Sequence, residues 1–154
     1  MQSNKGFNYH INKEGETIQE FIQATSATTK LRVIQNEGFS TYDFSFTSGR
    51  TVIYLCEVKT RDCNHDTYSD TILELGKVNR MFEKVCEARD TKGVFEEVKA
   101  GFLVKFNDGM YFIDMNKAQF KVDIKYCPVT TAEDNGYKSK TTAHYDLSTA
   151  IKIN

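Results

Sequence analysis

The stretch Thr51-Val-Ile-Tyr-Leu-Cys-Glu-Val-Lys59 decides the predicted fold, because it is a nearly unbroken apolar run that ends in charged residues. Continuous apolar character is typical of a central strand that is buried on both faces of a sheet. Side chains alternate along a strand, so Glu57 and Lys59 share one face, about 6.6 Å apart, and Val58 points the other way. A charged group at the end of such a strand requires a partner, since burying an unpaired charge is costly.

Asp43 is the candidate partner, and it belongs to the preceding segment. Residues 42–47 alternate between apolar and polar side chains, and a turn signal at residues 48–50 joins them to the buried strand. A three-residue loop at this turn places Asp43 opposite Leu55, on the face that carries Glu57. A two-residue loop would turn Asp43 to the opposite face, so the interpretation requires an odd-length loop or a bulge.

Two carboxylates that converge in this way repel each other unless a cation lies between them. Mg²⁺ fits this position, because it takes oxygen ligands, keeps several waters and needs only one or two carboxylates. An amine such as Lys59 beside the ion orients or helps to deprotonate a metal-bound water. Together these groups have the chemistry required to attack a phosphodiester.

The remaining segments predict a mixed α/β domain in which helices flank one sheet. A helix is predicted over residues 14–26, where the apolar side chains form a single stripe. A second helix is predicted over residues 70–88, with Thr71 and Glu74 as a capping box. The expected strands cover residues 31–34, 42–47, 51–59, 100–106, 110–115, 120–126 and 145–153. Residues 129–142 are polar and carry no clear prediction.

The pattern Tyr42-Asp43, a turn, and Glu57-Val58-Lys59-Thr60-Arg61 resembles the PD-(D/E)XK nuclease superfamily. The order helix–strand–strand–strand–helix–strand over residues 14–106 also resembles the core of that superfamily. The resemblance implies a restriction-endonuclease-like fold, with residues 107–154 as a C-terminal β-rich extension of a single domain spanning residues 1–154.

The resemblance also implies the site residues. Asp43, Glu57 and the backbone carbonyl of Val58 would bind the metal, and Lys59 would serve the nucleophilic water. Tyr42 stands where the superfamily name has Pro, at a position that varies within the family.

Further residues are candidates for auxiliary roles. Some members add a Glu from the first helix and a Lys or Gln from the second, for which Glu20 and Lys77 are the candidates. Both lie away from the apolar stripes of their helices, which predicts exposed side chains. Arg61 follows the motif directly and is the candidate for binding substrate phosphate.

We therefore expect a Mg²⁺-dependent nuclease, with Mn²⁺ as a substitute ion, that hydrolyses phosphodiester bonds of nucleic acid, and of the two nucleic acids we favour DNA over RNA as its substrate. One site in so small a domain reaches one strand, so cutting a duplex needs two copies or two encounters, and a homodimer is one solution. The alternative is a catalytically silent protein on the same fold that binds nucleic acid or serves as an assembly module.

Composition narrows the class of protein. The 154 residues carry 20 basic and 21 acidic side chains, for a formal net charge of −1, which argues against a strongly basic DNA-coating protein. No apolar run approaches the ~20 residues that span a bilayer, and the first ten residues lack the apolar core of a signal peptide. A soluble, cytoplasmic protein with four free cysteines is expected.

Cys63-Asn64-His65, between Asp62 and Asp66, has the residue types of a zinc site. The spacing is too tight for four ligands around one ion, so a polar loop near the active site is the interpretation that we favour. The chain has no phosphate-binding P-loop motif.

Overall fold

The computed structural model describes residues 3–26, 32–35, 41–48, 52–92, 97–129 and 136–154. Its larger sheet has six strands in the order β1-β2-β3-β5-β6-β9. The bounds are β1 Arg32–Gln35, β2 Phe44–Ser48, β3 Val52–Thr60, β5 Glu97–Phe106, β6 Gly109–Asp114 and β9 Ile151–Lys152. Strands β3 and β5 pair in parallel along nine residues, and the other pairings of this sheet in the described residues are antiparallel.

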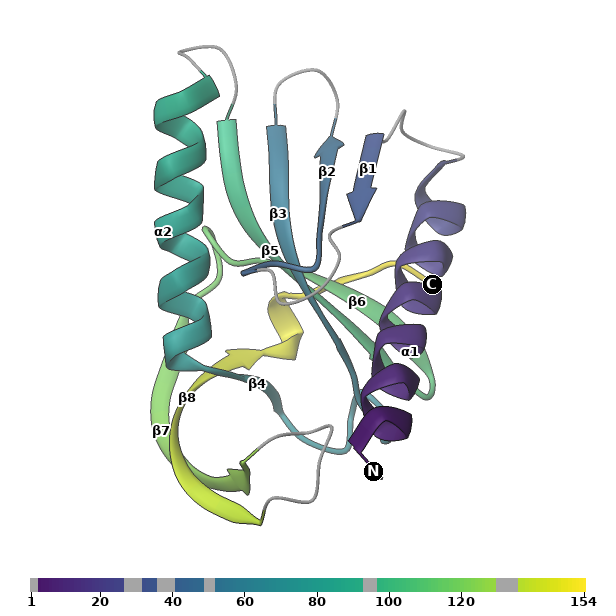
Figure 1. Ribbon diagram of the computed structural model, residues 1–154, viewed down its shortest axis with the longest axis vertical. Coiled ribbons are helices and arrows are strands. Elements are labelled where there is room, and N and C mark those ends of the chain that lie inside the picture. The colour runs from purple at the N-terminus through teal and green to yellow at the C-terminus, as the bar shows by residue number, and fades with distance from the viewer. Residues whose placement is uncertain (1–2, 27–31, 36–40, 49–51, 93–96, 130–135) are drawn as a thin grey trace.

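Two helices cover opposite faces of this sheet, as Figure 1 shows. Helix α1 (Ser3–Ser26) packs Ile18 and Phe21 against Phe44, Cys56 and neighbouring apolar side chains. Helix α2 (Leu75–Lys92) packs its own apolar stripe against the other face, which includes Leu55 and Phe102. Strand β3 is therefore buried from both sides over its central part, as its apolar run predicts.

A second, smaller sheet has the order β4-β8-β7. Strand β4 (Asp70–Glu74) leads directly into α2, and β7 (Phe120–Pro128) and β8 (Tyr137–Asp146) form a long antiparallel pair that curves away from the main sheet (Figure 1). A short 3₁₀ helix, η1 (Leu147–Thr149), connects β8 to β9.

The predicted helix–strand–strand–strand–helix–strand order is present, with β4 inserted before the second helix. The prediction that Thr71 and Glu74 form a capping box is wrong, because these residues belong to β4 and the helix begins at Leu75. Pairing with β8 overrides the local capping signal, since every residue of β4 has a partner there. Cys56 is buried, whereas Cys86 is exposed.

The structure also revises the segments near the ends of the chain. The first helix begins at Ser3, and the second half of the polar stretch 129–142 belongs to β8, while residues 130–135 lie outside the described residues. The final predicted strand is divided among the end of β8, η1 and β9. In the described part of the chain, neither helix has the length and apolar character needed to cross a membrane.

Candidate active site

The β2–β3 hairpin positions the first two carboxylates. Phe44 pairs with Cys56 and Ser48 with Val52, so the ladder is shifted by two residues from the predicted one and keeps its parity. Extending it by one residue places Asp43 opposite Glu57, not opposite Leu55 as expected. The Asp43 N–H donates to the Cys56 carbonyl at 2.8 Å, and Asp43 Oδ2 accepts the Val58 N–H at 2.7 Å. Both bonds hold the Asp43 carboxylate at the end of β3.

Glu57 is only 3% exposed although it is an acidic residue. Its Oε1 lies 2.9 Å from Lys59 Nζ, and its Oε2 lies 2.8 Å from Lys77 Nζ. Oε2 is buried and, within the described residues, accepts no hydrogen bond of good geometry. Two ammonium groups thus balance the buried carboxylate electrostatically and leave one of its oxygens poorly satisfied.

A third carboxylate comes from α1. Burial raises the pKa of Glu14 above its ordinary value, and the negative charge of Glu57 adds to this effect while Lys59 and Lys77 oppose it. Burial likewise raises the pKa of Asp43 to about 7, with Glu57 and Glu14 as the next causes and the Val58 N–H acting against them. Glu14, Asp43 and Glu57 therefore form a partly desolvated group of like charges.

Lys59 is a charged member of this group. Burial alone would lower the pKa of its ammonium, but Glu57, Asp43 and Glu14 together outweigh burial and raise the pKa. A protonated Lys59 is a donor of hydrogen bonds and a fixed positive charge beside the carboxylates. We call Glu14, Asp43, Glu57, Lys59 and Lys77 the acid–lysine cluster.

The expected exposure of Lys77 is wrong. Lys77 lies in the first turn of α2, and its side chain, 21% exposed, reaches Glu57. Helical side chains point toward the N-terminus of their helix, so a long side chain in the first turn extends beyond the helix toward whatever lies before it. A cation at this end is unfavourable to the helix dipole, and Glu57 offsets that cost.

Glu20 lies apart from the acid–lysine cluster. Its Oε2 forms an ion pair with Lys105 Nζ at 2.8 Å, and its side chain is 44% exposed. Glu14 and Glu20 are separated by about 9 Å along the helix at ~1.5 Å per residue. Glu14 was not identified from the sequence as a site residue. Glu14 nevertheless precedes Ile18 and Phe21 by four and seven residues and so continues their buried stripe.

Arg61 follows the cluster residues of β3 along the chain, and Val58 lies between Glu57 and Lys59. The Arg61 Nη2 donates to the Ile72 carbonyl at 2.7 Å, so this guanidinium ties the start of the loop after β3 to β4. Burial lowers the pKa of Arg61. The Val58 N–H is used by Asp43, and its carbonyl remains a predicted metal ligand. A phosphate-binding role for Arg61 also remains a prediction.

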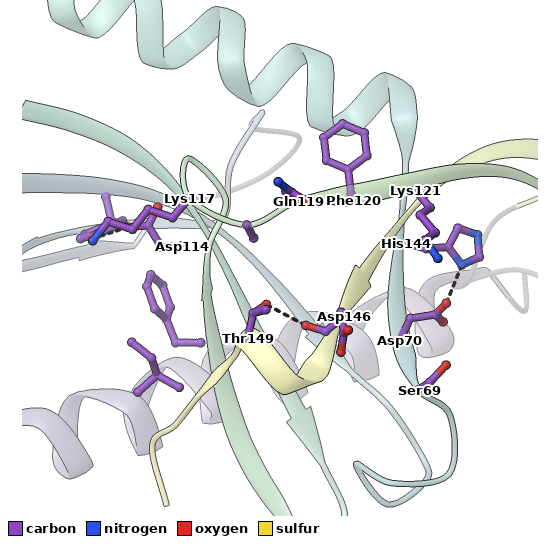
Figure 2. A pocket seen from close by; sticks show the side chains of 14 residues that line it. Ser69, Asp70, Asp114, Lys117, Gln119, Phe120, Lys121, His144, Asp146 and Thr149 are labelled. Carbon is purple, nitrogen blue, oxygen red and sulfur yellow. Dashed lines mark hydrogen bonds and ion pairs between the residues drawn. The ribbon is translucent and has the colours of Figure 1, made fainter.

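A cleft lies elsewhere in the described part of the chain, between the two sheets (Figure 2). It has a volume of about 670 Å³, and no member of the acid–lysine cluster lines it. Its wall includes His144, whose Nδ1 lies 3.0 Å from Asp70 Oδ2 and whose Nε2 lies 2.9 Å from Thr142 Oγ1. The charged lining mixes acidic and basic side chains, namely Asp70, Asp114, Asp146, Lys117 and Lys121, which gives no uniform surface for phosphate.

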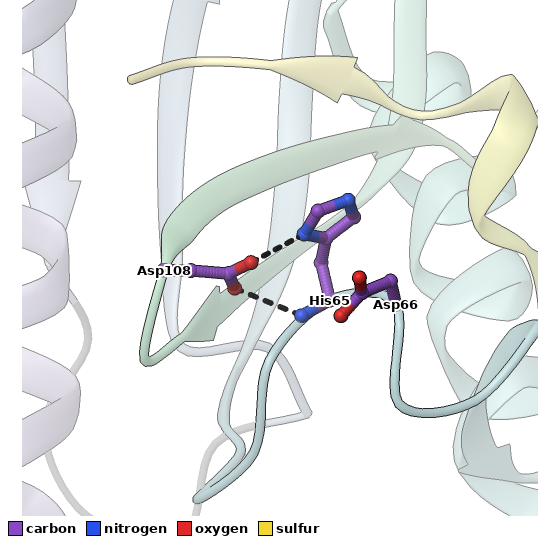
Figure 3. A group of neighbouring side chains, drawn as sticks. All are labelled: His65, Asp66 and Asp108. Atoms are coloured by element: carbon purple, nitrogen blue, oxygen red, sulfur yellow. Dashed lines mark hydrogen bonds and ion pairs between the residues drawn. The ribbon is translucent and has the colours of Figure 1, made fainter.

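A second acidic group lies on exposed loops (Figure 3). The possible ligand atoms of three residues, His65, Asp66 and Asp108, lie within 4.8 Å of one another. Among the described residues, this is the set of three that meets this distance. Asp108 accepts from both the backbone N–H and the ring Nδ1 of His65, and the His65 ring stacks on Tyr111. The predicted polar loop thus packs on the β5–β6 turn, with neither Cys63 nor Asp62 in this set of three.

The acid–lysine cluster fits a divalent cation by the chemistry of its donors. Carboxylate oxygens are the ligands that Mg²⁺ and Mn²⁺ prefer. A cation would offset both the burial and, to a smaller extent, the repulsion by Glu57 and Glu14 that raise the pKa of Asp43 to about 7. The poorly satisfied Glu57 Oε2 would gain a partner in the same way.

A fold with these features is found in a solved structure of a Holliday junction resolvase, Hjc of Archaeoglobus fulgidus. The TM-score is 0.57 at 14% sequence identity, and the match covers 92% of each chain. The predicted restriction-endonuclease-like fold is thereby confirmed.

The family follows from the sequence itself. The model of the family described as "Phage putative PDDEXK endonuclease" matches residues 9–128. The chain therefore belongs to this PDDEXK endonuclease family, and the predicted resemblance is confirmed. A comparison with curated proteins gives no match.

Proposed function

We propose that the protein is a divalent-metal-dependent nuclease that hydrolyses phosphodiester bonds of DNA at the acid–lysine cluster. Membership of a nuclease family supports the reaction class, and the buried, doubly paired Glu57 beside Asp43 is the observation that supports this location. Strongly perturbed carboxylates held on rigid elements are typical of catalytic sites.

Asp43, Glu57 and the Val58 carbonyl are the groups that would hold Mg²⁺ or Mn²⁺, and Glu14 would complete or support this ligand set. The bound ion would lower the pKa of water and stabilise negative charge on the phosphate. Lys59 remains protonated in the proposal, because its neighbours raise its pKa, and it orients the attacking water through a hydrogen bond. Lys77 holds the Glu57 carboxylate in place through its ion pair.

The proposal for DNA rests on a likeness in fold. The solved structure that shares the fold is a Holliday junction resolvase, and branched DNA is accordingly one substrate to test.

A cleavage assay tests the proposal. Labelled single-stranded, duplex and branched DNA are incubated with the protein in Mg²⁺, in Mn²⁺ and in a chelator. Cleavage that requires a metal is expected. Glu57→Gln and Lys59→Met should each reduce the single-turnover rate about 10²–10³-fold, which is the loss typical of one preorganised electrostatic group.

Glu83→Gln is the matched control, because Glu83 is an exposed acidic residue of α2 outside the cluster. Its rate should equal that of the unmodified protein. Full cleavage by Glu57→Gln would refute the assignment of the site. Binding of DNA without cleavage, unaffected by metal, would instead identify a silent binding module.

A further inference from the structure

A small pocket lies between the loop that follows β3 and the small sheet. Its volume is about 330 Å³, which lies in the range of pockets that hold small organic groups. The loop, the end of β5 and all three strands of the small sheet contribute to it, and its lining includes Arg61, Tyr68, Ile72, Phe106, Lys125 and His144. We call it the loop pocket, and it shares no residue with the acid–lysine cluster.

The loop pocket adjoins the acid–lysine cluster through Arg61. The Arg61 N–H donates to the Lys105 carbonyl at 2.8 Å, which extends the parallel β3–β5 ladder by one residue. Side chains alternate along a strand, so Arg61 lies on the face of Glu57 and Lys59, about 6.6 Å beyond Lys59. Burial lowers the pKa of Arg61, and the negative charge of Glu57 is among the groups that oppose this effect. A ligand in the loop pocket would therefore lie next to the proposed cleavage site.

His144 brings a positive charge to the wall of the loop pocket. The Thr142 hydroxyl donates its one proton to the Asp123 carbonyl at 3.1 Å, so its oxygen accepts from His144 Nε2 at 2.9 Å. Asp70 Oδ2 lies 3.0 Å from His144 Nδ1 (Figure 2), and an ionised carboxylate can only accept a hydrogen bond. Both ring nitrogens of His144 therefore carry a proton.

The lining of the loop pocket is cationic. Arg61, Lys125 and His144 are positive, and Asp70 is the one carboxylate among the described residues that line it, which leaves a net charge of +2. The Asp70 charge is engaged by His144. Lys125 Nζ lies 4.0 Å from Asp123 Oδ2, which is too long for a hydrogen bond. The pocket thus favours an anion, unlike the cleft of mixed charge between the two sheets.

The rest of the lining is apolar and aromatic. Phe106 is buried, Ile72 is half-buried, and Tyr68 is 68% exposed at the pocket. An exposed aromatic ring beside cationic side chains is typical of proteins that bind unpaired nucleotides, because a base stacks on the ring while the cations contact the phosphate. The loop pocket has both of these parts within one small volume.

We infer that the loop pocket binds one unpaired nucleotide of the substrate strand, beside the bond that is cut, with the base on Tyr68 and the phosphate at Arg61 and Lys125. This inference rests on the proposed nuclease function and names the structural feature that the site selects. A base enters a pocket only outside the double helix, and the cost of leaving the helix is smallest for a base that is already unpaired. Bulged, single-stranded and branched DNA should therefore be preferred to a fully paired duplex.

Binding of three related DNA molecules tests the inference. The first is a fully paired duplex, the second carries one bulged thymine nucleotide, and the third carries an abasic nucleotide at the same bulge. Affinity is measured by fluorescence anisotropy in a chelator, so that no cleavage is required. The thymine bulge should bind about tenfold more tightly than the abasic bulge, as expected for one base stacked on an aromatic ring, and more tightly than the paired duplex.

Variants of the pocket separate its two parts. Tyr68→Ala should weaken binding of the thymine bulge about tenfold and leave the abasic bulge unchanged, whereas Tyr68→Phe should retain the full affinity. Tyr137→Ala is the matched control, because Tyr137 is also exposed, at 58%, and lies outside the pocket. Lys125→Met should weaken both bulges equally and reduce the salt dependence of binding by about one phosphate contact.

The outcomes distinguish this inference from the proposed function. Equal affinity for the thymine and abasic bulges would overturn the inference, as would a Tyr68→Ala variant that binds the thymine bulge normally. Metal-dependent cleavage that is equally fast on paired and bulged duplexes would overturn the inference and leave the nuclease function standing. Binding of the bulge that depends on Tyr68, without cleavage in any metal, would support the pocket and refute the nuclease function.

Discussion

Two acidic groups in this molecule invite comparison: the buried acid–lysine cluster and the exposed set of His65, Asp66 and Asp108. The exposed set is the tighter one, with its ligand atoms within 4.8 Å of one another. The buried cluster is more strongly perturbed. Burial raises the pKa of Asp43 to about 7, whereas at Asp108 the hydrogen bonds from His65 outweigh desolvation and lower the pKa.

The difference teaches that proximity of carboxylates does not by itself indicate a site. Asp108 is satisfied by two hydrogen bonds from His65 on a solvated surface, so a cation there would replace an existing partner. In the buried cluster the charges of Asp43, Glu57 and Glu14 oppose one another with little water to screen them. A cation there would relieve an electrostatic cost that the fold already carries.

Among the variants below that test whether the buried cluster is the site, Glu14→Gln is expected to have the largest effect. Glu14→Gln should reduce the single-turnover cleavage rate about 10–100-fold and raise the Mg²⁺ concentration needed for half-maximal rate, as loss of a supporting ligand does. Glu20→Gln, on the same helix, should change the rate less than about twofold, because it removes only a half-exposed ion pair with Lys105. The reverse order of the two variants would restore Glu20 as the helix residue of the site.

A smaller effect is expected on stability in the absence of metal. The folded-state pKa of Asp43, about 7, lies above its ordinary value of 3.8, so folding favours the protonated form. The contribution of Asp43 to the free energy of unfolding is fully present below pH 3.8 and is lost as the pH rises through 7. Asp43→Asn, which keeps an oxygen for the Val58 N–H, should therefore melt about 3–6 °C higher than the unmodified protein at pH 8.

At pH 4 the two melting temperatures should coincide, because Asp43 is then protonated in the folded state. Thermal unfolding followed by circular dichroism in a chelator, across this range, gives the comparison. A variant that is less stable at pH 8 would show that the Asp43 charge is not repelled in the fold.

The sequence predicted the elements that pack on both faces of β3, because apolar periodicity there is strong. It failed at β4, where the local pattern of residues 70–74 is compatible with a helical turn and only pairing with β8 makes it a strand. Such long-range pairing leaves no signal in a short window of sequence. The same holds for β8, a polar strand whose partners lie on both sides of it.

In the candidate site, the motif residues Asp43, Glu57 and Lys59 were predicted from strand alternation and a turn of odd length, and the hairpin preserves that parity. The residues contributed by helices were harder to predict. Lys77 reaches Glu57 through side-chain length and direction, which a helical wheel ignores. Glu14 continues the buried stripe of Ile18 and Phe21 in the sequence, but that it lies near Glu57 depends on which turn of α1 packs over the end of β3.

Metal binding, followed as a change in melting temperature, tests the central claim most directly. At about 100 times its dissociation constant, Mn²⁺ should raise the melting temperature of the unmodified protein by about 5–10 °C. Asp108→Asn should show the same increase, and Asp43→Asn should show little or none. An increase that survives Asp43→Asn and disappears in Asp108→Asn would place the metal on the exposed loops and would contradict the account.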